Sequence, residues 1–171
     1  MEKVGKTIWI TGLSGAGKTT IGKMLYTYMK KKSNNVILLD GDTLREVYQD
    51  YTYTTESRIE LTYRNARLCK MLNEQGIDVI ICCIAMYDEC REWNRKNILN
   101  YIEIYLKVPV DVLIQRDSKK LYSKAIKSEI KNVMGIDMEY EEPKNPDIEI
   151  ENYGLNTVEK ALKIIIDKFN L

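Results

Sequence analysis

The sequence predicts an α/β fold, in which a five-stranded parallel sheet carries helices on both faces. Three observations support this prediction. Short apolar segments alternate along the chain with longer segments of helical periodicity, as in βαβ units. Residues 79–84 are apolar at every position, which is typical of a central strand buried on both faces. A glycine-rich loop at residues 12–19 joins the first strand to the first helix, in the order expected of a phosphate-binding loop.

The first expected elements have clear local signals. Residues 7–11 are apolar or β-branched and predict a buried strand. The helix after the loop places Ile21, Leu25 and Met29 on one face. Strands are expected at 7–11, 36–40, 79–85, 101–107 and 147–151. Helices are expected at 18–31, 56–75, 89–100 and 110–131.

A last helix is expected after a cap at Asn156, whose side chain would accept from the first turn. Its apolar face comprises Val158, Leu162, Ile165 and Phe169. The 171 residues suffice for one domain with a proper core, and no linker interrupts them. We therefore expect a single domain over 1–171, with ligands at the carboxyl ends of the strands.

The composition argues against several classes of protein. A net charge of +1, from 26 basic and 25 acidic residues, disfavours a dedicated nucleic-acid binder. No apolar run approaches the length of a membrane span, and there is no room for a signal peptide before the first strand. The four cysteines match neither zinc nor C-x-x-C spacing, so we expect reduced core residues in a cytoplasmic protein. Because the chain has no histidine, proton abstraction falls mainly to carboxylates.

The glycine-rich loop fits G-x-x-x-x-G-K-[ST] at every fixed position. Its backbone N–H groups and the helix N-terminus are expected to bind the phosphates of ATP. Lys18 would reach the β- and γ-phosphates, and the Thr19 hydroxyl would bind Mg²⁺. An incidental glycine-rich turn is disfavoured because motif and context agree. The expected ATP-binding residues are Gly12, Leu13, Ser14, Gly15, Ala16, Gly17, Lys18, Thr19 and Thr20.

Two carboxylates, Asp40 and Asp42, follow the second strand, whose end should lie beside the loop. One could hold the Mg²⁺ shell, and the other could accept a proton from an attacking hydroxyl. The alternative is a solvated turn that carries aspartates. Arg45, Tyr53 and Arg58 come next, and arginine forks with a flat ring suit a phosphorylated or sulfated nucleotide. Missing GTPase signatures favour a small kinase over a switch protein.

Over almost its whole length the chain resembles the adenylylsulfate (APS) kinase family. Residues 12–20 match that family's loop, and residues 39–45 resemble its L-D-G-D-x-x-R. Residues 116–125 resemble R-D-x-K-G-L-Y-x-K-A, and residues 135–143 resemble G-I-D-x-x-Y-E-x-P. The resemblance implies a P-loop kinase with a small lid at about 116–145. It also implies transfer of the ATP γ-phosphate to a ribose 3′-hydroxyl, and a homodimer, which family members often form.

The resemblance implies roles for individual residues. Asp42 resembles the family's base, while Lys18 and Arg116 would neutralise charge on the transferring phosphoryl group. The expected metal ligands are Thr19 and Asp40. The expected acceptor site comprises Asp40, Arg45, Tyr53, Arg58, Leu61, Ile84, Ala85, Lys119 and Leu121.

The departures from the family pattern are expected to cluster around the acceptor. Leu61 replaces an amide, Tyr63 an arginine and Ala85 a serine, and Asp88 replaces another arginine. Losing a designed hydrogen-bond partner can change discrimination by on the order of 10⁴. We therefore expect a nucleotide acceptor other than APS, as in the branch of the family that acts on cytidine diphosphoramidate in bacterial capsule biosynthesis. The alternatives are an APS kinase, which makes 3′-phosphoadenylylsulfate, a non-catalytic nucleotide-binding protein, and a kinase for a small metabolite such as a sugar acid.

Overall fold

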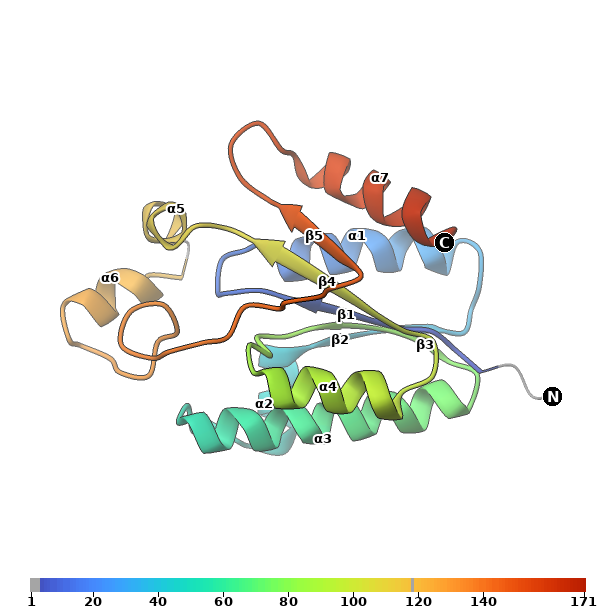
Figure 1. Ribbon diagram of the computed structural model, residues 1–171, viewed down its shortest axis with the longest axis horizontal. Helices are drawn as coiled ribbons and strands as arrows, with labels where there is room; N and C mark the ends of the chain where they lie inside the picture. The colour runs from blue at the N-terminus through green and yellow to red at the C-terminus, as the bar shows by residue number, and fades with distance from the viewer. Residues whose placement is uncertain (1–3, 118) are drawn as a thin grey trace.

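The five expected strands form one parallel sheet in a computed structural model, which describes residues 4–117 and 119–171. The strands are β1 (Thr7–Thr11), β2 (Val36–Asp40), β3 (Asp78–Cys82), β4 (Tyr101–Lys107) and β5 (Ile148–Glu151). Their order across the sheet is β2-β3-β1-β4-β5, and each neighbouring pair is parallel (Figure 1). The predicted fold class is therefore confirmed.

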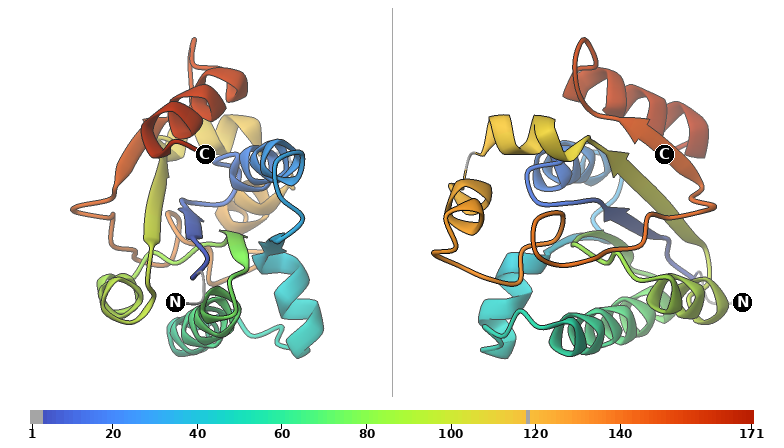
Figure 2. Two further views of the ribbon diagram at one scale, coloured as in Figure 1. Left: turned by 90° about the vertical axis from the view of Figure 1, so that its right-hand side faces the viewer. Right: turned by 60° about the vertical axis from the view of Figure 1, so that its left-hand side comes forward.

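Helices cover both faces of this sheet. They are α1 (Lys18–Lys30), α2 (Gly41–Tyr48), α3 (Thr55–Glu74), α4 (Asp88–Asn97), α5 (Val110–Arg116), α6 (Leu121–Ile126) and α7 (Val158–Phe169). Helices α1 and α7 lie on one face, whereas α3 and α4 lie on the other (Figure 1, Figure 2). The short helices α5 and α6 lie beyond the carboxyl ends of the strands.

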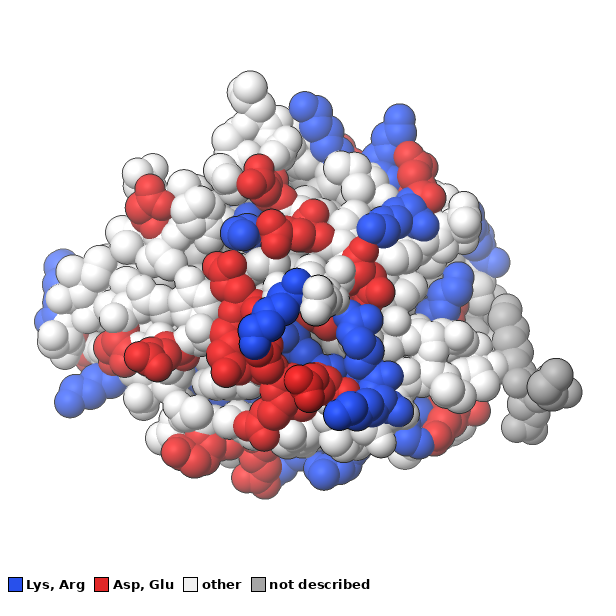
Figure 3. Space-filling model, viewed as in Figure 1, with Lys and Arg blue, Asp and Glu red and all other residues white. Residues whose placement is uncertain are grey.

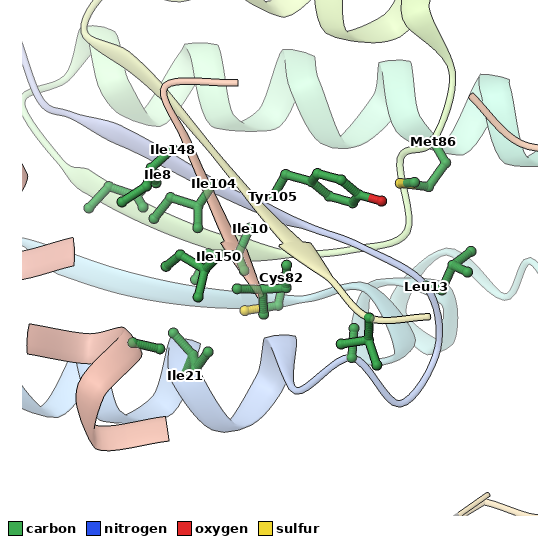
Figure 4. Packing of buried hydrophobic residues seen from close by; sticks show 14 of the residues in the cluster. Ile8, Ile10, Leu13, Ile21, Cys82, Met86, Ile104, Tyr105, Ile148 and Ile150 are labelled. Carbon is green, nitrogen blue, oxygen red and sulfur yellow. The ribbon is translucent and has the colours of Figure 1, made fainter. Parts of the chain in front are cut away.

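Alternate residues of the strands fill a separate core on each face, because successive side chains of a strand point to opposite sides. Ile8, Ile10 and Ile21 belong to the core under α1 and α7 (Figure 4). Ile165 of α7 belongs to the same core. Trp9 lies between Ile8 and Ile10 in sequence and belongs to the other core, under α3 and α4. All of these side chains are fully buried.

Strand β3 ends three residues earlier than predicted. The amide of Cys83 still donates to the carbonyl of Ile10, but the amide of Ala85 donates to the Thr11 hydroxyl instead of a strand carbonyl. The two cysteines at this end of the strand are buried and free, as predicted for core residues. Burial raises the pKa of Cys82 to about 12 and that of Cys83 well above its usual value, so both thiols are neutral.

The expected helix at 110–131 is wrong, because the chain forms two short helices there. Asp117 follows α5 with a φ of 21°, and its carboxylate accepts from the amides of Tyr122 (2.9 Å) and Ser123 (3.0 Å). It therefore caps the first turn of α6 and ends the previous helix. Lys120, just before α6, adopts a left-handed φ of 53°, at the position where the family pattern has glycine.

Two further expectations are corrected. Helix α2 was not predicted; Asp40 caps it, since its Oδ1 accepts from the amide of Asp42 at 3.0 Å. The cap of α7 is Thr157 and not Asn156, because the Thr157 hydroxyl accepts from the amide of Lys160. The Asn156 side chain instead donates to the carbonyl of Glu151.

Acidic and basic side chains are interspersed over the face shown in Figure 3. Within residues 4–117 and 119–171, no helix is both long enough and apolar enough to span a bilayer.

Gly22 provides a test of the packing between α1 and β3. A Cβ atom at this position would lie 2.3 Å from Sγ of Cys82. Gly22→Ala should therefore lower the free energy of unfolding by roughly 1–3 kcal/mol, although alanine favours helices elsewhere. Urea denaturation measures this change. The fall in the free energy of unfolding should be smaller when Gly22→Ala is made in a Cys82→Ala background. The control is Thr27→Ala on the exposed side of α1, which should change stability by about 0.5 kcal/mol or less. Equal losses in both backgrounds would contradict the assigned clash.

Candidate active site

The phosphate-binding loop connects β1 to α1, in the order that the sequence predicts. Gly12, Gly15 and Gly17 adopt left-handed φ values of 145°, 77° and 97°, which favour glycine. Nζ of Lys18 donates to the carbonyls of Gly12 and Leu13, both at 2.8 Å. Burial lowers the pKa of Lys18 to about 8. The structure thus brings residues 12–20 together around a buried cation at a helix N-terminus, the arrangement that binds phosphates.

Side chains from distant segments support this loop. Nη2 of Arg116 donates to the carbonyl of Asn152 (2.7 Å), and its Nη1 to that of Gly15 (3.4 Å). Nδ2 of Asn152 in turn donates to the carbonyl of Ala16 at 2.7 Å, and the Tyr122 hydroxyl donates to that of Ser14 at 2.8 Å. The sequence predicted Arg116 near the phosphates but missed Asn152 and Tyr122. Arg116 contacts the loop and does not line the cavity described below.

The two predicted carboxylates lie beside the loop. The Thr19 hydroxyl donates to Oδ2 of Asp40 at 2.7 Å, while the other oxygen of Asp40 caps α2. A threonine hydroxyl next to a carboxylate at a phosphate site is the oxygen ligand set that Mg²⁺ uses with nucleotide phosphates. Oδ2 of Asp42 accepts from Nζ of Lys119 at 2.6 Å, and this hydrogen bond raises the pKa of Lys119.

The predicted acceptor residues also lie together. The guanidinium carbon of Arg45 lies 4.4 Å from the ring centroid of Tyr53, and that of Arg58 lies 5.4 Å from it. Nη1 of Arg45 donates to the carbonyls of Asp50 and Thr52, so this side chain also holds the loop after α2. Nη2 of Arg58 donates to a carbonyl at residue 132, in the predicted lid. Burial lowers the pKa of Arg58.

One cavity of about 670 Å³ joins the loop to the acceptor residues. The predicted residues on its wall are Ser14, Gly15, Gly17, Lys18, Thr19, Thr20, Asp40, Asp42, Arg45, Tyr53, Arg58, Leu61, Ile84, Lys119 and Leu121. The wall also includes residues that the sequence interpretation did not assign to the site: Gly41, Glu46, Tyr51, Thr62, Asn65, Cys82, Cys83 and residues 130–134. Helical spacing from Arg58 could have pointed to Thr62 and Asn65, since they lie four and seven residues further on.

The departures from the family pattern do not all face this cavity. Leu61 lines it, as expected. Ala85 is fully buried outside the cavity wall, which corrects its assignment to the acceptor site. Tyr63 packs edge-on against Trp93, with ring centroids 6.0 Å apart, and thereby joins α3 to α4. Asp88 bonds Arg91 and a lysine at residue 144. Of these four departures, only that at Leu61 alters the cavity wall directly.

Comparisons with known proteins agree with this geometry. The family model for adenylylsulphate kinase matches residues 4–151. A cytidine diphosphoramidate kinase from Campylobacter jejuni subsp. jejuni serotype O:2 is 46% identical over 164 residues, 96% of this chain and 96% of that protein. A probable adenylyl-sulfate kinase from Pyrococcus abyssi is 38% identical over 162 residues, 94% of this chain and 93% of that protein.

A solved structure matches over nearly the full length. It is the APS kinase of Mycobacterium tuberculosis in complex with AMPPNP and APS, with a TM-score of 0.90, 30% sequence identity and 99% of each chain covered. The chain therefore belongs to the adenylylsulphate kinase family of P-loop kinases, which transfer a phosphoryl group to a hydroxyl.

Proposed function

We propose that this protein is an Mg²⁺- and ATP-dependent kinase that phosphorylates the ribose 3′-hydroxyl of cytidine diphosphoramidate, for capsule biosynthesis. The observation that carries the proposal is the single cavity that Lys18, Asp42 and Arg58 all line. The relative that is 46% identical, a cytidine diphosphoramidate kinase, supports the choice of acceptor.

The donor half of the cavity binds ATP. Lys18 exchanges its two loop carbonyls for oxygens of the β- and γ-phosphates, because charged oxygens are stronger acceptors than carbonyls. Thr19 and Asp40 would hold Mg²⁺, since their oxygens already lie together beside the loop. When bound, the metal neutralises charge on the phosphate oxygens. Arg116 adds positive charge beside the loop.

Asp42 accepts the proton of the acceptor hydroxyl. The ribose 3′-oxygen forms a bond to the γ-phosphorus, the bond from that phosphorus to the leaving ADP oxygen breaks, and the hydroxyl proton passes to the carboxylate. Lys119 is bound to Asp42 at 2.6 Å, and Arg58 is bound to the carbonyl at residue 132. These contacts support a lid at about 116–145 that closes over both substrates within one domain spanning 1–171.

The acceptor half binds a nucleotide. Arg45 and Arg58 neutralise its 5′-diphosphate group, and Tyr53 stacks on its base. Leu61 leaves this wall apolar where the family pattern has an amide. An APS kinase is the second candidate, and the family match together with the 38% identical relative favours it. The Asp42–Lys119 pair in the cavity argues against a non-catalytic protein.

An acceptor panel tests the proposal. We expect ADP when the protein is incubated with Mg²⁺, ATP and cytidine diphosphoramidate, and little ADP with APS or with sugar acids. Coupled ADP detection measures turnover, and ³¹P NMR of the product should locate the new phosphate on the ribose. ADP with APS alone would establish the second candidate. No ADP with any acceptor would support a non-catalytic protein.

Asp42→Asn tests the base. Turnover should fall by about 10²–10⁴, because the amide does not take up the hydroxyl proton. ATP binding, measured by calorimetry, should change little because the loop is untouched. The control is Asp167→Asn on the exposed side of α7, which makes the same chemical change far from the cavity and should retain full turnover. Near-normal turnover in Asp42→Asn would remove Asp42 from this role.

The lowered pKa of Lys18 predicts proton uptake on nucleotide binding. Above pH 8 the free lysine is largely neutral, whereas the phosphates favour its charged form, so binding takes up a proton. AMPPNP affinity should fall by up to about tenfold per pH unit above pH 8. Calorimetry at pH 9 in buffers of different ionisation enthalpy measures the uptake. Lys18→Arg stays charged and should abolish it; equal uptake in both proteins would assign the proton elsewhere.

A further inference from the structure

Asn65 is a buried polar residue of the cavity to which the proposed reaction gives no role. It lies on α3 and is only 2% exposed. Among the described residues, its Oδ1 has no hydrogen-bond partner. Five buried side-chain atoms in the described chain share this condition, and only that of Asn65 belongs to a residue on the cavity wall. Oδ1 is itself buried, so a ligand donor pairs with it only after the side chain turns toward the cavity that Asn65 lines. Such a pairing would remove the cost of an unpaired buried amide oxygen and thereby add affinity.

The position of Asn65 separates it from the phosphate-binding groups. Arg58, Leu61 and Asn65 lie three and four residues apart on one face of α3 and line one wall. The arginine is at the start of this stripe, the apolar leucine follows, and the amide is one turn further along the helix. The hydroxyl of Thr62, which also lies on this wall, already donates to the carbonyl of Arg58 at 2.8 Å. In the proposed binding mode, the acceptor phosphates lie at Arg58 and the base lies further along α3, toward Asn65.

We propose that Asn65 recognises the amino-bearing edge of the acceptor base, an inference that rests on the proposed nucleotide acceptor. An amide offers one acceptor and one donor side by side. Cytosine presents an amino group next to a ring nitrogen, and adenine presents the same pair; the amino group donates to Oδ1 and the ring nitrogen accepts from Nδ2. This is the pairing by which asparagine reads adenine in nucleic acids. A keto base reverses donor and acceptor at this edge.

A structural role for Asn65 makes different predictions. Nε1 of Trp9 is another buried donor without a partner among the described residues, and Trp9 packs in the core under α3. If solvent joined the two groups, removing the amide would leave the indole unpaired and lower stability. Base recognition instead predicts that an apolar residue of similar size is neutral or stabilising, because an unpaired buried group is removed.

The test compares wild type with Asn65→Leu on two acceptors that differ only in one group. Cytidine and uridine diphosphoramidates exchange an amino for a keto group. We expect wild type to prefer the cytidine compound by at least about 100-fold in kcat/KM, because a site built around a donor rejects its absence. Asn65→Leu should reduce this ratio to about tenfold or less, with an unchanged KM for ATP and an unchanged or higher Tm. If Asn65→Leu does not fold, Asn65→Ala replaces it in the same comparison.

A second pair of acceptors separates this inference from the proposed function. Adenylylsulfate and its inosine analogue make the same amino-to-keto exchange on a purine. If wild type uses only adenylylsulfate and its inosine analogue, the proposed cytidine acceptor is wrong. Asn65 then keeps its proposed role if Asn65→Leu lowers the kcat/KM preference for adenylylsulfate over the inosine analogue. An unchanged ratio in every active pair, or a lowered Tm with an unchanged ratio, would overturn the inference. If wild type neither turns over nor binds any of the four compounds, both proposals fail.

Discussion

The hydrogen bond between Thr19 and Asp40 joins the phosphate-binding segment to the carboxylates at the end of β2. It exists because β1, β3 and β2 are parallel neighbours, so that their carboxyl ends reach the same edge of the sheet. In this register Cys82 lies opposite both Ile10 and Asp40. The loop after β1 and the carboxylates after β2 are therefore placed on either side of β3. The order of the strands therefore sets the separation between the phosphate loop and these carboxylates. The cavity lies at the same edge of the sheet.

The predicted lid is connected to both halves by polar contacts. Arg116 and Tyr122 bind carbonyls of the phosphate loop, and Lys119 binds Asp42. Arg58 reaches across to the carbonyl at residue 132. Arg58, Arg116 and Lys119 make these contacts with charged side chains and Tyr122 makes its contact with a hydroxyl, whereas the sheet behind them is held by two apolar cores. A rigid sheet under a lid bound by exchangeable hydrogen bonds suits an enzyme that must exclude water during transfer and then release products.

The acceptor wall shows how one fold can serve related nucleotides. The phosphate loop depends on backbone conformation and a single lysine, and it has little freedom to vary. The wall formed by α3 instead presents separate side chains to the cavity. In the proposed binding mode, a change at Leu61 or Asn65 would therefore alter recognition without disturbing the loop. Other departures from the family pattern, such as Tyr63, stabilise the packing of α3 on α4 and do not face the ligand.

The sequence by itself determined the parallel sheet, the loop and the carboxylates beside it, because these depend on short-range signals: apolar runs, glycines at fixed spacing and residues directly after a strand. It could not determine contacts between residues far apart in the chain. Asn152 supports the loop at Ala16 across 136 residues, and no local pattern marks it. Asp117 ends one helix by capping the next, although the periodicity of 110–131 is continuous. Only the packing of α3 on the sheet decided which of its side chains line the cavity. The same packing leaves Oδ1 of Asn65 without a hydrogen-bond partner among the described residues.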